Sequence, residues 1–588
     1  MIRYPASELS PAARVQQLRR ITDEVLDVLV IGGGVTGAGV ALDAASRGLR
    51  TGLVEAVDWA AGTSSRSSKL VHGGLRYLQM LDFHLVHEGL RERSLLLGRL
   101  APHLVTPVPI LYPLHTPVLE RLAVGAGVGL YDLMGGAVAR SGGNGSLPRH
   151  RHLSRGQALA TAPALRPSAL CGAVLYHDGQ VDDARFVTEL VRTAALYGAV
   201  VVNRARATGL LTRQGRVVGA RVVDTESGRE HELAARVVVS ATGVWSEDTE
   251  DLAGQGRAVR VRPSKGVHLV LPADRVDSRA GLILRTETSV LFVLPWQGRW
   301  VIGTTDTDWP YDKSRPLPTA ADVDYILARV NGVLRRPLGR GDVTGAFAGL
   351  RPLVAGEGVV RGPGESGADS ERSGPTAKLS REHAVGCPAP GFVVVSGGKY
   401  TTYRVMAADA VDAAVREAGL TAPASRTRAI PLLGARHFAQ VLADGHSAPG
   451  QQGQDAAGAE HLLHRYGGQV GEVLGPISEN PSLGAPLGAA CGRPTRYLRA
   501  EVVHAVTHEG ALHLDDVMAR RARLAIEEPD GAVYLAAEVA SLMAPPLQWG
   551  PATVAEEIRR YREGAELLAR AVEAPDDAAA ARLAADTP

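Results

Sequence analysis

Near the N-terminus, three glycines, Gly32, Gly34 and Gly37, directly follow a β-branched apolar run. The string over 27–48, DVLVIGGGVTGAGVALDAASRG, predicts a buried strand, a tight turn and a helix, and the TGLVE string after it predicts a second strand. This order is a βαβ unit, which requires a parallel sheet. The G-x-G-x-x-G spacing lets backbone N–H groups at the helix N-terminus approach a pyrophosphate, so we expect a dinucleotide site here.

An acidic residue at the end of the second strand, Glu55, supports this prediction. It lies 18 residues beyond Gly37, where a carboxylate accepts hydrogen bonds from a ribose and disfavours the 2′-phosphate of NADP. The alternative is a tight strand–helix turn without a ligand. At this step NAD and FAD both remain candidates for the bound dinucleotide. Further strand–glycine–helix segments at 241–245 and 396–402 indicate one long cofactor that the whole molecule contacts, which favours FAD.

Charge and cysteine content exclude several classes of protein. The 588 residues carry 64 basic and 62 acidic side chains, a net charge of +2, and this balance argues against a nucleic-acid partner. The cysteines, Cys171, Cys387 and Cys491, are far apart, which argues against a disulfide framework, an iron–sulfur cluster or structural zinc, so no metal site is predicted. We expect a reducing, cytoplasmic location, with no signal peptide and no membrane-spanning segment.

The fold class predicted is α/β (α+β overall), with a Rossmann-like FAD-binding domain, an antiparallel substrate domain and a helical C-terminal domain. The proline-rich segment 102–117 is expected to be a loop. The expected boundaries are a discontinuous FAD-binding domain over 22–100, 180–261 and 391–420, a substrate or cap domain over 101–179 and 262–390 with a flexible loop at 356–376, a helical domain over 426–575 and a frayed tail over 576–588.

Several longer strings point to a family. They are GGGVTGAG, GTSSRSSKLVHGGLRYL, SATGVW, SKGVHLVL, VIGTTDTDW, GLRPL, LSREHAV and SGGKYTTYR. Together they resemble the FAD-dependent (aerobic, respiratory) glycerol-3-phosphate dehydrogenases, within the wider amino-acid-oxidase-like FAD oxidoreductases of the glutathione-reductase type of fold. The string EVVHAVTHEGALHLDDVMARRARL resembles the helical C-terminal domain of the same family. Two departures are Val244, where many relatives have proline, and Tyr400, where the family usually has an aliphatic residue.

The resemblance implies oxidation of sn-glycerol 3-phosphate to dihydroxyacetone phosphate, with a hydride passing from C2 to N5 of the flavin. It also implies which residues contact FAD. The glycines provide close backbone approach, and the Ser/Thr run provides hydroxyl donors. The cofactor-binding residues expected are Gly32, Gly34, Gly37, Glu55, Thr63, Ser64, Ser68, Lys69, Gly73, Gly74, Leu75, Gly243, Gly398, Lys399 and Thr402.

The substrate phosphate requires local cationic donors, because the chain has no overall positive charge. Arginine donates to a phosphate in a planar, bidentate way that lysine cannot match. Residues inside matching motifs are therefore the candidates, whereas most of the arginines are expected on the surface or between domains. The substrate-binding residues expected are Arg76, Tyr77, Lys265, Thr304, Arg351 and Arg381.

Removing the hydroxyl proton of the substrate requires a base or a cation that stabilises the alkoxide. His268, in SKGVHLVL, is the best base at neutral pH, although an arginine or a lysine could supply the electrostatic part instead. Lys399 follows two glycines at a predicted helix N-terminus, where it could neutralise charge on the reduced flavin or touch the substrate. The catalytic residues expected are thus His268, Arg351 and Lys399.

No motif identifies the electron acceptor. The leading interpretation is a respiratory enzyme, a peripheral protein on the cytoplasmic face of the membrane, that passes electrons to membrane quinone. The closest alternative is an oxidase that passes them to oxygen and releases peroxide. A NAD-dependent dehydrogenase and a flavin-containing binding or RNA-modifying module are more distant alternatives. A homodimer is compatible with the sequence, which contains nothing that specifies the oligomeric state.

Overall fold

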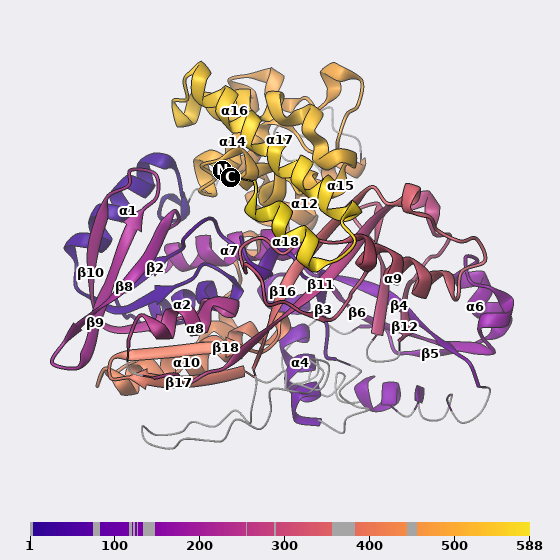
Figure 1. The fold of residues 1–588 in the computed structure, drawn as a ribbon, viewed down its shortest axis with the longest axis horizontal. Helices are drawn as coiled ribbons and strands as arrows, with labels where there is room; N and C mark the ends of the chain where they lie inside the picture. The colour runs from indigo at the N-terminus through magenta and orange to yellow at the C-terminus, as the bar shows by residue number, and fades with distance from the viewer. Residues whose placement is uncertain are drawn as a thin grey trace.

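The part of the chain that the structure describes forms two β-sheets, helices that pack against them and a group of C-terminal helices (Figure 1). The computed structural model describes residues 4–74, 83–116, 120, 124–125, 127–132, 147–254, 256–286, 290–354, 383–443 and 456–587. In Figure 1 the first sheet and its helices lie on the left, the second sheet lies on the right, and the C-terminal helices cover the region between them.

The first sheet has a parallel core in the order β18-β10-β1-β2-β7. An antiparallel strand, β17, pairs with β18 at one edge, and the β8–β9 hairpin extends from β10. The bounds of its strands are β1 (Leu26–Ile31), β2 (Thr51–Val54), β7 (Val200–Val202), β8 (Ala205–Arg213), β9 (Arg216–Asp224), β10 (Glu230–Ser240), β17 (His383–Ala389) and β18 (Phe392–Gly397). The predicted boundary at 391 is therefore wrong, because β17 belongs to this sheet and not to the substrate domain.

The predicted βαβ unit is confirmed. Strands β1 and β2 pair in parallel, and α2 (Val35–Ser46) connects them. Its small residues, such as Ala38 and Ala41, are fully buried in the same apolar core as Val28 and Val30 of β1. The other helices that the structure describes before residue 420 are α1 (Pro11–Asp23), α4 (Phe83–Leu95), α6 (Arg155–Thr161), α7 (Asp183–Leu196), α8 (Ser246–Asp251), α9 (Ala320–Asn331) and α10 (Tyr403–Glu417).

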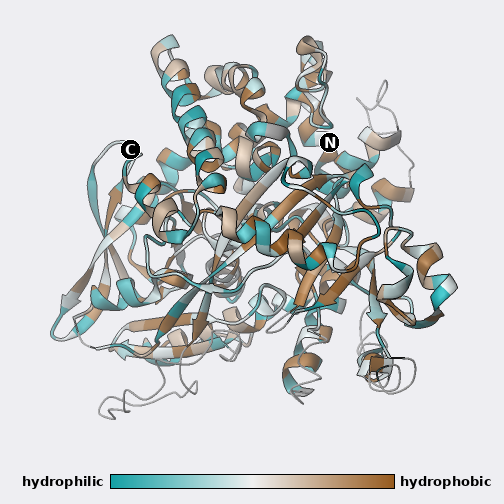
Figure 2. Cartoon of the chain, turned by 45° about the vertical axis from the view of Figure 1, so that its right-hand side comes forward, coloured by the Kyte–Doolittle hydropathy of each residue, from teal (hydrophilic) through white to brown (hydrophobic). Residues whose placement is uncertain are grey.

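The second sheet is mostly antiparallel and runs in the order β15-β11-β14-β13-β12-β4-β6-β3, with β16 paired to β11 and β5 paired to β6. Figure 2 shows brown, apolar stretches along the central strands of the molecule. The bounds are β3 (Leu70–Val71), β4 (Thr106–Leu114), β5 (Arg151–Ser154), β6 (Gly172–Gln180), β11 (Val261–Pro272), β12 (Gly281–Arg285), β13 (Val290–Trp296), β14 (Arg299–Gly303), β15 (Thr307–Asp308) and β16 (Gly345–Val354).

The segment 102–117 contains strand β4 and is not the loop that its prolines suggested. Pro107, Pro109 and Pro113 all lie at alternate positions of β4, so their missing N–H groups fall on one side of the strand. On the other side β4 pairs with β6 along its whole length. The N–H groups that these prolines lack would not have been used in the β4–β6 ladder. The prolines are therefore compatible with a strand at this position.

The C-terminal region is helical, as predicted. Its helices are α11 (Phe438–Ala443), α12 (Ala456–Tyr466), α13 (Val470–Leu474), α14 (Arg499–His508), α15 (Leu524–Glu527), α16 (Ala536–Leu547), α17 (Pro551–Glu573) and α18 (Asp577–Ala585). The prediction of a frayed tail is wrong. Asp576 caps α18 by accepting from the Ala579 N–H, and Ala580 is fully buried beside Leu567 and Leu317. Within the described ranges, no helix combines the length and the apolar content needed to cross a membrane.

Candidate active site

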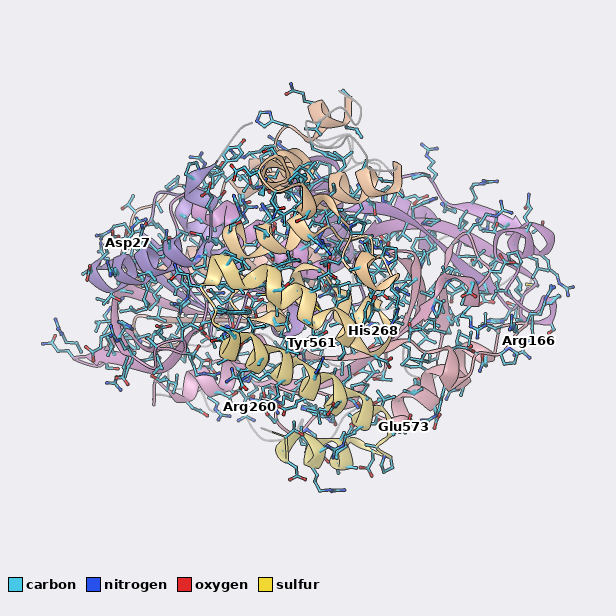
Figure 3. All side chains as sticks on the ribbon, turned by 90° about the horizontal axis from the view of Figure 1, so that it is seen from above. Asp27, Arg166, Arg260, His268, Tyr561 and Glu573 are labelled. Atoms are coloured by element: carbon cyan, nitrogen blue, oxygen red, sulfur yellow. The ribbon has the colours of Figure 1, made fainter. Side chains whose placement is uncertain are left out.

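A cavity of about 1320 Å³ lies where the two sheets and the C-terminal helices meet. Figure 3 shows His268, at the cavity, near the middle of the molecule, together with Tyr561 of α17, while Asp27 and Arg166 lie at opposite ends. Many of the predicted site residues, from motifs far apart in the sequence, line this cavity: Gly32, Gly34, Glu55, Thr63, Ser64, Ser68, Gly74, Gly243, His268, Thr304, Arg351, Gly398 and Lys399.

The glycines after β1 leave no room for side chains. A Cβ atom on Gly32 would lie 2.7 Å from the carbonyl oxygen of Ala241, and a Cβ atom on Gly37 would lie 1.8 Å from the carbonyl oxygen of Gly32. Gly32 also has φ of +109°, which favours glycine. The chain therefore packs closely around the N-terminus of α2 and leaves Gly32 and Gly34 bare on the cavity wall. This cradle fits the pyrophosphate of a dinucleotide.

Glu55 follows β2 and borders the cavity. Its Oε2 atom accepts from the N–H of Gly33 at 2.6 Å, and its Oε1 atom accepts from the N–H of Val57 at 2.8 Å. Burial raises the pKa of Glu55, and these two backbone donors oppose the shift. The carboxylate is thus held rigidly at the end of the cavity where the ribose of a dinucleotide is expected.

The segment 63–69 crosses the cavity between the two sheets. At its start, Ser64 Oγ accepts from the N–H of Val35 at the beginning of α2, 3.0 Å away, and Thr63 Oγ1 donates to the carbonyl oxygen of Leu350 on β16, 2.6 Å away. Further along, Ser68 Oγ lies 2.8 Å from Nε2 of His268 on β11. This short segment therefore contacts both the dinucleotide cradle and the second sheet.

His268 is almost fully buried and stacks on Phe347 of β16, with ring centroids 4.9 Å apart and an angle of 12° between the rings. Burial lowers the pKa of His268 well below 6.5, and the charges of Arg351 and Lys69 lower it further. Its second ring nitrogen, Nδ1, has no hydrogen-bond partner among the residues that the structure describes. The imidazole is therefore neutral near pH 7 and can act as a proton acceptor.

Arg351 and Thr304, both predicted to bind substrate, contact each other. Nη2 of Arg351 donates to Thr304 Oγ1 at 2.9 Å, and the guanidinium also donates to the carbonyl oxygen of Thr305 at 3.2 Å. Gly266 of β11 gives them space, because a Cβ atom there would lie 2.5 Å from Thr304 Oγ1. Asp306 Oδ1 lies 3.7 Å from Nη1 of Arg351. The result is a fixed guanidinium and hydroxyl on the cavity wall.

The turn after β18 completes this end of the cavity. Gly397 and Gly398 have φ of +78° and +74°, which allows the chain to turn sharply before Lys399. Tyr400–Thr402 form a short 3-10 turn that leads into α10, and Thr401 Oγ1 both accepts from the N–H of His72 (3.1 Å) and donates to its carbonyl oxygen (3.2 Å). Lys399 thus lines the cavity on a turn whose backbone is tied to the neighbouring loop.

Two lysines do not lie where the sequence analysis placed them. The ammonium group of Lys69 pairs with Asp183 at 2.8 Å, and that of Lys265 pairs with Asp322 at 2.5 Å and with Asp577 of α18. Both side chains are fully buried, and neither lines the cavity. The prediction that these lysines bind cofactor or substrate is therefore corrected: each forms buried ion pairs that join distant parts of the chain.

Three other predicted residues lie behind the cavity wall. Gly37 and Gly73 provide packing space, since a Cβ atom on Gly73 would lie 2.6 Å from Leu90 of α4. Thr402 Oγ1 donates to the carbonyl oxygen of Lys399 at 3.4 Å. The remaining predictions, Leu75, Arg76, Tyr77 and Arg381 and the loop at 356–376, lie outside the described residues.

Sequence reasoning missed several residues that shape the site. Phe347 stacks on His268, and Asp183 holds the segment 63–69. The C-terminal helices also contribute to the cavity wall, through Arg520, Arg523 and Tyr561 among others. The only signal in the sequence was the Arg-rich string MARRAR before α15, which carries no indication of its partners.

Comparisons with known proteins agree with this arrangement. Residues 27–404 match the family model described as FAD dependent oxidoreductase, and residues 425–554 match the model described as the C-terminal domain of alpha-glycerophosphate oxidase. The chain is 48% identical to glycerol-3-phosphate dehydrogenase 2 of Mycobacterium bovis, over 100% of this chain and 96% of that protein. It is 35% identical to the mitochondrial glycerol-3-phosphate dehydrogenase of Homo sapiens, over 96% of this chain and 76% of the human protein.

A solved structure shows the same fold. The glycerol-3-phosphate dehydrogenase from Bacillus halodurans, complexed with FAD, superposes with a TM-score of 0.74 at 30% identity, over 96% of this chain and 99% of that chain. The match includes the C-terminal helices as well as both sheets. The cradle at Gly32 and Gly34 and the carboxylate of Glu55 are features that fit FAD, and FAD is the cofactor of this chain.

Proposed function

Because the chain belongs to the glycerol-3-phosphate dehydrogenases, within the FAD-dependent oxidoreductases, we propose that it oxidises sn-glycerol 3-phosphate to dihydroxyacetone phosphate. The observation that carries this proposal is that His268, Thr304, Arg351 and Lys399 border the same cavity as the dinucleotide cradle. They come from four separate motifs, and together they supply a base, a hydroxyl donor and two cations.

Several residues hold the cofactor in this proposal. The backbone at Gly32, Gly34 and Val35 faces the pyrophosphate, Glu55 accepts from the ribose, and the turn at 397–399 faces the flavin ring. Bound FAD supplies the acceptor for the hydride that leaves C2 of the substrate.

The substrate phosphate binds to Arg351, which is preorganised because Thr304 and the Thr305 carbonyl already fix its guanidinium. Lys399 adds a second positive charge to the same cavity. Fixed donors of this kind orient the C2 hydroxyl without a further loss of side-chain entropy at the moment of reaction. Arg76, Tyr77 and Arg381 remain proposed as additional phosphate ligands.

The proton of the C2 hydroxyl passes to Nε2 of His268 by way of the Ser68 hydroxyl, which gives its own proton to Nε2 and takes the proton of the substrate. The lowered pKa of His268 keeps the ring neutral before the reaction, and the nearby Ser68 hydroxyl can donate to the neutral Nε2 or accept from the protonated Nε2–H. Loss of this proton as the hydride leaves C2 produces the ketone.

We propose membrane quinone as the electron acceptor, with the protein bound peripherally at the cytoplasmic face of the membrane. The second candidate is an oxidase that reduces oxygen to peroxide. One observation favours it, namely that the model matched by residues 425–554 is described as the C-terminal domain of alpha-glycerophosphate oxidase.

Anaerobic mixing with sn-glycerol 3-phosphate tests the substrate and cofactor together. We expect the flavin absorbance to bleach, whereas glycerol, which lacks the phosphate, should leave it unchanged. An oxidised flavin spectrum after mixing with sn-glycerol 3-phosphate would contradict the proposed substrate.

The reduced enzyme is then offered either a soluble quinone analogue or oxygen. Rapid reoxidation by the quinone supports the dehydrogenase proposal. Reoxidation by oxygen alone, with one peroxide released for each substrate consumed, would replace it with the oxidase. Flotation of the protein with liposomes, with and without added quinone, tests the membrane proposal separately.

A further inference from the structure

A buried polar cluster connects the C-terminal helices to the segment 63–69. We propose that Asp183 and Arg523 are positioning residues of the active site, which fix this segment so that Ser68 meets His268. This inference rests on the proposed function for the identity of the reaction. Neither residue lies within hydrogen-bond distance of His268, so both would act through the segment between them and the imidazole.

Asp183, the first residue of α7, accepts hydrogen bonds from three neighbouring parts of the chain. Its Oδ2 atom accepts from the N–H and the hydroxyl of Ser67, at 2.9 and 2.7 Å, and from Nζ of Lys69 at 2.8 Å. Its Oδ1 atom accepts from Nζ of Lys69 at 2.8 Å, from the N–H of Ala184 at 2.9 Å and from Nη2 of Arg523 at 3.1 Å. Both oxygens are thus fully used.

Arg523 reaches this carboxylate from the C-terminal region, 340 residues away in the sequence. Its Nη2 atom also donates to the carbonyl oxygen of Ser65 at 2.8 Å, the same oxygen that Lys69 Nζ contacts at 2.8 Å. Side-chain exposure is 0% for Lys69 and Asp183 and 2% for Arg523, so water does not replace these contacts. The cluster therefore holds the segment at Ser65, Ser67 and Lys69.

Ser68 lies between the residues that the cluster fixes. The residue before it, Ser67, and the residue after it, Lys69, are both bound to Asp183. These two anchors fix the backbone of Ser68, and its hydroxyl oxygen lies 2.8 Å from Nε2 of His268. Lys69 has φ of +61°, a conformation that non-glycine residues adopt rarely and only when their surroundings impose it.

A second contact links the cluster to the imidazole. The ammonium group of Lys69 lies 4.9 Å from the centre of the Phe347 ring, and that ring stacks on His268. Removal of Arg523 leaves Asp183 with a single cation and frees the Ser65 carbonyl from one donor. A displaced segment would then move the hydroxyl partner of His268 and withdraw the Lys69 ammonium group from the ring on which His268 stacks.

The test compares Arg523→Met with a matched control, Glu472→Gln. Glu472 pairs with buried Arg192 at 3.2 Å, also between α7 and the C-terminal helices, and no described contact joins this pair to the segment 63–69. For Arg523→Met we expect the limiting rate of anaerobic flavin reduction by sn-glycerol 3-phosphate to fall about tenfold or more, since misplaced catalytic groups have effects of this size. The apparent Kd for substrate should change much less, and Arg523→Lys should recover part of the rate.

The visible circular dichroism of bound FAD provides a reading that needs no substrate. We expect it to change in Arg523→Met and not in Glu472→Gln, which retains the wild-type reduction rate. Wild-type rates and dichroism in Arg523→Met would overturn the positioning role, as would an equal loss of rate in both variants. If wild-type FAD is not reduced by glycerol 3-phosphate, the proposed function fails, whereas the dichroism still tests the positioning role.

A variant that does not fold is replaced by a milder one. Ser67→Ala removes the hydroxyl that donates to Asp183 at 2.7 Å and accepts from the N–H of Lys69 at 3.1 Å, and it leaves the backbone N–H contact with Asp183 and both ion pairs in place. The same change in dichroism and the same fall in reduction rate are expected from it. Unchanged values for both in Ser67→Ala would overturn the proposal.

Discussion

The hydroxyl oxygen of Ser68 lies 2.8 Å from Nε2 of His268, although 200 residues separate the two in the sequence. Ser68 belongs to a segment that also contacts the start of α2, whereas His268 belongs to the second sheet. The proposed base therefore lies on the second sheet, whereas its hydroxyl partner comes from a segment that is tied to the first sheet.

The first prediction concerns the pH dependence of catalysis. Burial, with the charges of Arg351 and Lys69, lowers the pKa of His268 well below 6.5, so the acidic limb of the kcat/KM profile should lie below about pH 6.5. His268→Ala should remove this limb and lower kcat. Steady-state kinetics over a pH series measure the acidic limb and kcat. His231→Ala on β10 is the control and should leave both unchanged. A limb that persists in His268→Ala would exclude this residue as the base.

The second concerns phosphate binding. Arg351→Ala should lower kcat/KM for glycerol 3-phosphate by about thirtyfold, equivalent to about 2 kcal/mol, because a charge-assisted contact is lost. FAD should remain bound, since the guanidinium contacts Thr304 and Thr305 and not the dinucleotide cradle. Arg340→Ala, which breaks an exposed ion pair with Asp324, is the control and should behave as wild type. Wild-type kinetics in Arg351→Ala would contradict the assignment.

The third concerns the cofactor cradle. Gly37→Ala would place a Cβ atom 1.8 Å from the carbonyl oxygen of Gly32, so the backbone around the pyrophosphate site must move. We expect the purified variant to contain little FAD, as measured by its ratio of flavin to protein absorbance. Gly156→Ala on α6 is the control, because nothing lies within 4 Å of a Cβ atom there. Full flavin content in Gly37→Ala would show that the cradle tolerates the shift.

The fourth concerns stability and pH. Burial alone would lower the pKa of His513, but hydrogen bonds to Glu226 and Glu557 outweigh it and raise the pKa to about 9. A raised histidine pKa stabilises the fold fully below the unfolded value of about 6.5, and this contribution is lost as the pH rises to about 9.

Thermal unfolding of wild type and His513→Gln at both pH values tests this effect. The free-energy advantage of wild type should shrink by ~2 kcal/mol between about pH 6.5 and 9, after allowance for partial exposure. Because His513 joins the β9–β10 turn to α17, the change should appear in the docking of the C-terminal helices. A constant difference between the two proteins would refute the prediction.

Local patterns predicted much of the fold and the cradle. The spacing of Gly32, Gly34 and Gly37 and the carboxylate of Glu55 depend on a few neighbouring residues, so one sequence contains the whole signal. The prediction of a frayed tail after Pro575 was wrong because the signal for order there does not lie in neighbouring residues. Its helix is short and alanine-rich, and the partners that stabilise it, such as Leu317, lie far away in the sequence.

Long-range ion pairs explain the errors within the site. The chain has only 5 lysines among 64 basic residues, and three of them lie inside family motifs, which made them attractive as ligands. Lys69 instead pairs with a carboxylate 114 residues away, and Lys265 pairs with one 312 residues away. Such partners depend on how the two sheets and the C-terminal helices pack, and no local pattern in the sequence specifies that packing.

The strand order of the first sheet also determines when, during translation, β1 can pair with its neighbouring strands. β1 ends at residue 31, but its neighbour β10 begins at residue 230 and β18 follows only at residue 392. At a synthesis rate of about 5–20 residues per second, roughly 10–40 seconds pass before β10 is made, and during this time the backbone N–H and C=O groups along one edge of β1 have no partner strand. The growing chain therefore has to shield this strand, by chaperones or by transient contacts, long before its final neighbours are translated.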